Sequence, residues 1–288
     1  MAGDLRTRIE TAAAFIRSRT PVRPEAGVIL GTGLGDFAGA LTAESVIPYR
    51  EIPHFPHSTV EGHAGELHLG RLANRPVAVM KGRAHYYEGY PMEQVAFPVR
   101  VLRALGCQTL VITNAVGGLN PTMPAGTLVV TRDHINLMGD NPLIGPNDDS
   151  LGPRFPDMSE PYALALVALA ERAAESLGIP LQRAVFVAVA GPNLETAAEY
   201  RFLRWIGADV VGMSLVPEVI AAVHGGQRVL AFNVVTDTCN PDHLEPVSIP
   251  EILKVAGTMA PVLIRLVTEI VRRLDEVTEH RLSPAENR

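Results

Sequence analysis

The stretch TLVITNAVGG, residues 109–118, begins with a nearly continuous run of aliphatic and β-branched side chains and ends in small and polar ones. An apolar run without polar alternation is typical of a strand that is buried on both faces of its sheet. Both faces of a sheet are covered when helices pack on each side of it. The stretch therefore predicts a central strand of a helix-covered sheet.

Six further stretches share this apolar character and are also expected to be strands: 27–33, 75–83, 127–135, 184–192, 208–214 and 228–237. Helical patterns lie between them, near 5–19, 92–105, 160–177, 195–206, 216–224 and 249–275. The alternation predicts an α/β fold, a single domain over residues 1–288, with a central mixed, largely parallel twisted β-sheet flanked by α-helices. The long segment 139–156, rich in Pro, Gly and Asn, is expected to be a functional loop.

Composition narrows the classes of protein to consider. The chain is 47% hydrophobic and 19% charged, which is enough for a large core, and its net charge of −6 favours neither nucleic acid nor an anionic membrane as a partner. No stretch approaches the ~18 apolar residues of a membrane span. Two cysteines without metal-ligand spacing, and a charged N-terminus unlike a signal peptide, predict a cytoplasmic protein.

Polar clusters follow the expected strands: GTGLG at 31–35, KGRAH at 81–85, TNAVGG at 113–118, GPNLE at 191–195, GMS at 212–214 and TD at 236–237. In open α/β sheets, ligands bind beyond the carboxyl ends of the strands. Six such clusters in one chain therefore predict the wall of one binding site.

Each cluster alone has a plain structural alternative. GTGLG lacks the dinucleotide spacing, so it is either a tight turn or a cradle for a single phosphate that includes the Thr32 hydroxyl. Arg83 and His85, two apart on an extended segment, would point the same way and suit an anion, but they also fit a solvated strand end. Glu195 is equally consistent with an ordinary first-turn acid of a helix. No carboxylate or cysteine spacing supports a metal at His57 and His63, so no metal site is expected.

Together, the motifs resemble the trimeric purine nucleoside phosphorylase family, which is related to the methylthioadenosine phosphorylases. They occur in the family's order from about Gly27 to the final helix: GTGLG, FPHSTVEGHAG, KGRAHYYEGYP, TNAVGGLNP, GPRFPDMS, GPNLETAAE and GADVVGMSLVPE. The resemblance implies an enzyme of purine salvage. Such an enzyme uses phosphate to cleave the N-glycosidic bond of a purine (deoxy)ribonucleoside, which yields a free purine and α-(deoxy)ribose 1-phosphate.

The resemblance also implies roles for particular residues. A phosphate site would be formed by Thr32, His63, Arg83, His85, the backbone N–H of Ala115, and Ser214. The nucleoside would meet Tyr87, Phe155, Leu194, Glu195, Met213, Asp237 and Ile249, with Phe155 lent by a neighbouring subunit of a homotrimer. His85, Glu195 and Asp237 would be the catalytic groups. Inorganic phosphate would be a co-substrate, and neither a metal nor an organic cofactor would be needed.

Two departures from the family bear on specificity. Asp237 stands where the family usually has Asn, and Ile249 and Leu253 lie where a His is often found. At both positions the residues resemble those of the methylthioadenosine phosphorylases. Glu195 instead resembles the residue found in enzymes that act on 6-oxopurine nucleosides. A purine nucleoside phosphorylase is the leading expectation, and a methylthioadenosine phosphorylase is the alternative. A non-catalytic nucleoside-binding protein is a further alternative, but it would not need the phosphate-binding residues.

Overall fold

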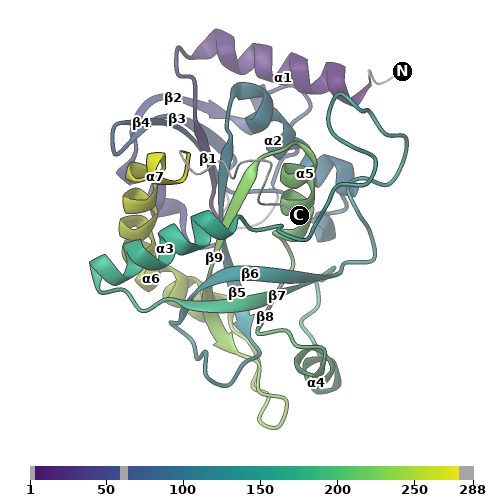
Figure 1. Ribbon diagram of the computed structural model, residues 1–288. Coiled ribbons are helices and arrows are strands. Elements are labelled where there is room, and N and C mark those ends of the chain that lie inside the picture. The colour runs from purple at the N-terminus through teal and green to yellow at the C-terminus, as the bar shows by residue number, and fades with distance from the viewer. Residues whose placement is uncertain (1–3, 59–63, 279–288) are drawn as a thin grey trace, which may run out of the picture.

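The computed structural model describes residues 4–58 and 64–278 and has a nine-stranded mixed sheet at its centre (Figure 1). The strands are β1 (Ala26–Ile29), β2 (Thr42–Pro48), β3 (Glu66–Leu72), β4 (Arg75–Lys81), β5 (Thr109–Gly118), β6 (Leu128–Leu137), β7 (Gln182–Val189), β8 (Val210–Gly212) and β9 (Arg228–Thr238). Their order in the sheet is β2-β3-β4-β1-β5-β8-β7-β6-β9, and β5 pairs with β9 as well.

The predicted α/β fold with a mixed sheet is confirmed. The pairs β1–β4, β1–β5, β5–β9, β6–β7 and β7–β8 are parallel, and the pairs β2–β3, β3–β4, β5–β8 and β6–β9 are antiparallel. The side chains of Leu110, Val111 and Ile112 in β5 have no exposed surface, as expected of a central strand. Because β5 pairs with β1, β8 and β9, the ends of several strands converge around it.

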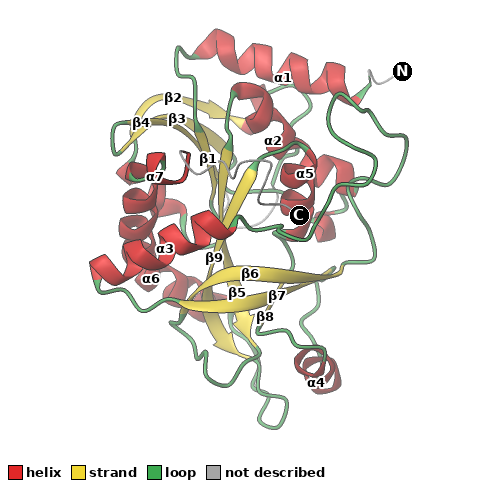
Figure 2. Ribbon diagram, in the orientation of Figure 1, coloured by secondary structure: helices red, strands yellow, loops and turns green. Residues whose placement is uncertain are grey.

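Helices cover the sheet on both sides (Figure 2). They are α1 (Leu5–Arg19), α2 (Met92–Leu105), α3 (Leu164–Leu177), α4 (Ala197–Trp205), α5 (Val216–His224), α6 (Ile249–Arg272) and the short α7 (Asp275–Thr278). Helices α1, α2 and α5 pack together, and α3 packs with α6 and α7 in a second group. None of the helices in the described part of the chain has the length and apolar character that crossing a membrane requires.

Two strands, β2 and β3, were not predicted from the sequence. β3 has the sequence ELHLGRL and alternates between more and less buried side chains, and most residues of β2 are exposed. Strands of this kind belong to antiparallel sheet with one face toward solvent, so they carry no continuous apolar run. The predicted strand 27–33 is also shorter than expected, because β1 ends at Ile29 and a turn follows it, in which Leu34 N–H donates to Gly31 O.

Helix α6 directs its first turn toward the strand ends. Its buried residues recur every three or four positions, which places them on one face against the core: Ala256, Ala260, Leu263, Leu266, Val267, Ile270 and Val271. The helix begins at Ile249, beyond the carboxyl end of β9. The amphipathic pattern therefore fixes the side of α6 that packs on the sheet and brings Ile249 and Ile252 to the site described next.

Candidate active site

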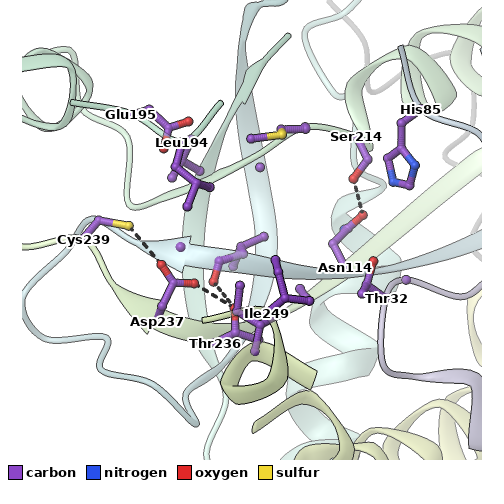
Figure 3. A pocket seen from close by; sticks show the side chains of 18 of the residues that line it. Thr32, His85, Asn114, Leu194, Glu195, Ser214, Thr236, Asp237, Cys239 and Ile249 are labelled. Atoms are coloured by element: carbon purple, nitrogen blue, oxygen red, sulfur yellow. Dashed lines mark hydrogen bonds between the residues drawn. The ribbon is translucent and has the colours of Figure 1, made fainter. Parts of the chain in front are cut away.

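A cavity of about 350 Å³ lies where the carboxyl ends of β1, β4, β5, β7, β8 and β9 come together (Figure 3). Of the residues predicted for the site, the following line it: Thr32, Arg83, His85, Tyr87, Ala115, Leu194, Glu195, Met213, Ser214, Asp237 and Ile249. Each strand-end cluster found in the sequence contributes at least one of them. The six clusters therefore line one cavity, and their role in binding stays a prediction.

One predicted residue is not part of this wall. Phe155 lies in the loop between β6 and α3 with 88% of its surface exposed, and it does not line the cavity of its own chain. His63 lies outside the described residues. Leu253 also needs a correction: Ile252 lines the cavity with Ile249, whereas Leu253 lies near Gly33. Positions three apart share a helix face, so the partner of Ile249 is Ile252.

Glycine at position 31 allows β1 and β5 to approach closely at one end of the cavity. A Cβ atom there would lie 2.6 Å from the carbonyl oxygen of Thr113 and 2.9 Å from the Cα of Asn114. A side chain would therefore push the turn that carries Thr32 away from β5. GTGLG is thus a tight turn that also lines the cavity.

Arg83 is held by protein acceptors at this end of the cavity. Only 3% of its surface is exposed, and its Nη1 lies 2.6 Å from Asn114 Oδ1 and 3.1 Å from Glu218 Oε2. Its Nη2 donates to the carbonyl oxygen of Thr113 at 2.5 Å. Burial raises the pKa of Glu218 although the charge of Arg83 acts in the opposite direction. The sequence did not indicate Glu218 as the partner of Arg83.

Asn114 connects Arg83 with Ser214. Its Oδ1 accepts from the Ser214 hydroxyl at 3.2 Å as well as from Arg83, and its Nδ2 donates to Asn233 Oδ1 at 2.8 Å. Ser214 stands just before α5, so the partial positive charge of that helix terminus lies beside it. Hydroxyl, guanidinium and helix terminus together suit an anion. The sequence indicated Asn114 only as a member of the TNAVGG cluster.

His85 is oriented by Glu88 and by an aromatic ring. The Oε1 of Glu88 lies 3.2 Å from His85 Nδ1 and accepts from the His85 backbone N–H at 2.6 Å. The Tyr87 ring stacks on the imidazole with centroids 4.8 Å apart. Burial lowers the pKa of His85, and burial raises the pKa of Tyr87 to about 12. Tyr87 therefore keeps its hydroxyl proton and can serve as a hydrogen-bond donor.

Asp237 and Glu195 occupy the other end of the cavity, away from His85 and Ser214 (Figure 3). Asp237 Oδ1 lies 2.9 Å from the Thr236 hydroxyl, and Oδ2 accepts from the Cys239 thiol at 3.5 Å. Burial raises the pKa of both carboxyls, and in Glu195 the nearby charge of Asp237 adds to the rise. Both carboxyls, which face the same space, therefore hold their protons more strongly than exposed carboxyls do.

Glu195 is not the ordinary first-turn acid that the sequence also allowed. It precedes the N-cap residue Thr196, whose side chain accepts from the Glu199 backbone N–H, while the Glu199 carboxylate accepts from the Thr196 backbone N–H. Glu199 thus stabilises the start of α4 as the acid of a capping box. Glu195 is left to line the cavity.

Sequence reasoning missed Tyr200 and Cys239, which complete the wall beside the two carboxyls. Both are buried, with 2% of the surface of each exposed, and they belong to one apolar cluster. Cys239 is two residues from Asp237 on the extended end of β9, a spacing that places both side chains on the same face. That spacing was the sequence signal that could have placed Cys239 beside Asp237 in the cavity wall. Among the described residues, no group of three His, Cys, Asp or Glu is arranged to hold a metal ion.

The sequence and the fold agree with those of known proteins. The model of the phosphorylase superfamily matches residues 25–272. Purine nucleoside phosphorylase 1 of Bacillus subtilis is 49% identical over 271 residues, which cover 94% of this chain and 100% of that protein. The mouse purine nucleoside phosphorylase is 45% identical and covers 92% of this chain and 94% of its own length.

Solved structures of purine nucleoside phosphorylases have a similar fold. Purine nucleoside phosphorylase of Schistosoma mansoni in complex with adenosine has a TM-score of 0.89 and 38% identity, covering 93% of this chain and 97% of that one. The same protein in complex with inosine has a TM-score of 0.88 and 37% identity, covering 93% and 96%. By sequence and fold, this chain belongs to the phosphorylase superfamily and, within it, to the purine nucleoside phosphorylases.

Proposed function

We propose that this protein catalyses the phosphate-dependent cleavage of the N-glycosidic bond of purine nucleosides, which releases the purine and α-(deoxy)ribose 1-phosphate. One observation carries the proposal. A single cavity has one end lined by groups that suit an anion, and another end lined by two carboxyls, Glu195 and Asp237. The first end is lined by Thr32, Arg83, His85 and Ser214. A protein that only binds nucleosides has no use for the first of these ends.

The two ends suit the charges that develop in this reaction. Breaking the glycosidic bond builds positive charge on the ribose and negative charge on the departing purine. Phosphate held by Ser214, Arg83 and the N-terminus of α5 stabilises the ribosyl cation and attacks it. A proton donor near purine N7 neutralises the leaving base, and protonated Asp237 is the candidate for that donor. None of these steps requires a metal or an organic cofactor.

Asp237 also bears on the choice of base. An ionised carboxylate only accepts hydrogen bonds, whereas a protonated one donates through one oxygen and accepts through the other. Protonated Asp237 can donate to N7 and accept from a 6-amino group. Because burial raises the pKa of Asp237, we propose that the enzyme accepts 6-aminopurine nucleosides in addition to the 6-oxopurine nucleosides that its family membership suggests.

A methylthioadenosine phosphorylase is the second candidate, and it rests on a specific observation. Ile249 and Ile252 present apolar side chains to the cavity, and Ile249 is 58% exposed at its edge. An apolar wall suits a 5′-alkylthio group better than a 5′-hydroxyl. The ratio of activity on 5′-methylthioadenosine to activity on adenosine separates the two candidates.

We further propose that the enzyme is a cytoplasmic homotrimer. Phe155 exposes 88% of its surface beside the exposed guanidinium of Arg154. Large apolar side chains that are exposed together on one surface mark an interaction site. Ile144, on the same loop, is 73% exposed. Contact of this loop with a neighbouring subunit would bury both side chains and bring Phe155 to the neighbour's cavity.

Steady-state rates with inosine, guanosine, adenosine and 5′-methylthioadenosine, each with and without phosphate, test the function. Release of free purine should depend on phosphate and should produce an equal amount of ribose 1-phosphate. The rates should be unchanged by a metal chelator. Purine release that is equally fast without phosphate would show a hydrolase, and no release from any of the four nucleosides would reject the proposal.

A further inference from the structure

Tyr200 and Cys239 lie in the wall between the two carboxyls of the cavity. Glu195 precedes α4, Tyr200 is in its first turns, and Asp237 and Cys239 lie at the end of β9. Both Tyr200 and Cys239 are buried, so their polar atoms can interact only with neighbouring groups or with a ligand in the cavity. These two residues have no role in the reaction as proposed above.

The four residues line one part of the cavity wall, and two of them are joined by a hydrogen bond. The Cys239 thiol donates to Asp237 Oδ2 at 3.5 Å. Tyr200 lines the same wall as Glu195 and packs in one cluster with Cys239, and its hydroxyl lowers the pKa of both the Glu195 carboxyl and the Cys239 thiol. A phenol has one proton to donate, so at any moment it can serve either Glu195 or Cys239. An ionised carboxylate is the stronger acceptor of the two, and a thiol sulfur is a weak one.

We propose that Tyr200 is a specificity-determining residue whose hydroxyl turns between Glu195 and the Cys239 sulfur according to the purine in the cavity. This inference rests on the proposed function, because it concerns the base that Glu195 faces. When the purine presents N1–H, as in a 6-oxopurine, Glu195 must be ionised to accept it, and Tyr200 donates to Glu195. When N1 carries a lone pair, as in adenine, Glu195 must be protonated to donate to it, and Tyr200 donates to sulfur.

The protons balance in both states. Cleavage of a 6-oxopurine nucleoside uses ionised Glu195 and protonated Asp237. Cleavage of a 6-aminopurine nucleoside uses both carboxyls protonated, and the additional proton on Glu195 comes from solvent when the substrate binds. Adenosine cleavage should therefore decline at a lower pH than inosine cleavage as the pH is raised.

Several groups set the ionisation of Glu195. Burial raises its pKa, a backbone N–H at Glu195 and the Tyr200 hydroxyl lower it, and the charges of Glu199 on α4 and Asp237 on β9 add to the rise. Cys239 lines the same wall, and the charge of Glu195 raises the pKa of its thiol. Of the side chains among these groups, Tyr200 is the one that stabilises the ionised carboxylate, so removal of its hydroxyl should favour the protonated form and thereby adenosine.

Tyr200→Phe keeps the ring and removes the hydroxyl, and it is the central variant of the test. The ratio of kcat/KM for adenosine to that for inosine should rise at least ~10-fold, because one hydrogen bond to an ionised group is lost. The acid limb of the inosine pH profile should move to higher pH. Cys239→Ala should move the ratio in the opposite direction, because the hydroxyl then keeps Glu195 as its acceptor. Cys107→Ala, which removes a buried thiol outside the cavity, should leave the ratio unchanged.

The outcomes separate this inference from the proposed function. A wild type without any phosphate-dependent cleavage rejects the function itself. An active wild type whose ratio and inosine pH profile are unchanged in Tyr200→Phe rejects the role of Tyr200, as does a ratio that moves in the same direction in both variants. A loss of packing alone would lower kcat/KM for both substrates by the same factor at every pH, and that result would also overturn the inference. If the wild type cleaves only inosine, Tyr200→Phe should produce measurable cleavage of adenosine.

Discussion

Asp237→Asn should shift the base preference toward 6-oxopurines. The amide fits the existing hydrogen bonds: its oxygen can accept from the Cys239 thiol, and its Nδ2 can donate to the Thr236 hydroxyl oxygen while that hydroxyl donates to the Val116 carbonyl. The second Nδ2 proton is then left for the purine. Because no buried polar group loses its partner, the free energy of unfolding should change by less than about 1 kcal/mol.

The magnitude follows from the contacts that change. With Asn, an acceptor for the 6-amino group is lost and a donor to O6 is gained. Each mispaired polar contact is worth about 1–3 kcal/mol, and about 1.4 kcal/mol corresponds to a factor of ten. The ratio of kcat/KM for inosine to that for adenosine should therefore rise at least ~10-fold, and ~100-fold if both contacts contribute.

The assay measures both substrates at saturating phosphate over a range of pH. Burial raises the pKa of Asp237, so activity that needs its protonated form should be present below that pKa and lost as the pH rises through it. The Asn variant cannot ionise and should lack that limb. A wild type that does not cleave 6-aminopurine nucleosides, together with an unchanged ratio in the variant, would show that Asp237 does not contact that edge of the base.

Three further predictions concern the rest of the site. Arg83→Ala should weaken phosphate binding by about 3 kcal/mol, seen as a higher KM for phosphate, and should lower the melting temperature because buried Glu218 loses its cation. Adding Glu218→Gln should restore stability without restoring the KM. Unchanged phosphate kinetics in a folded Arg83→Ala variant would contradict the assignment. Phe155→Ala should raise the KM for the nucleoside and leave the KM for phosphate nearly unchanged. Leu164→Ala, which also truncates an exposed side chain, should change neither KM. A fully active monomer in light scattering would disprove the shared site. Ile249→His should reduce the activity on 5′-methylthioadenosine relative to adenosine, and equal losses on both would place Ile249 away from the 5′ group.

The central sheet and the location of the site were predictable from the sequence because both depend on local patterns. A strand such as β5 is covered on both faces and carries a continuous apolar run, and the turn after it requires small or polar residues. β2 and β3 escaped prediction because their exposed faces interrupt such runs with polar residues. The polar clusters at the strand ends indicated the lining of the cavity for the same local reason, down to individual residues such as Glu195 and Asp237.

Only the tertiary structure decided the partners of these residues. Arg83 meets Glu218 across 135 positions of sequence, and Tyr200 meets Cys239 across a junction between α4 and the end of β9. Such pairings depend on the order of strands in the sheet, which places β5 beside β1, β8 and β9 although these strands lie far apart in the chain. The chemistry of a side chain is local and can be read from the sequence. Its burial and its partners, which set its pKa and its hydrogen bonds, arise only when distant segments pack together.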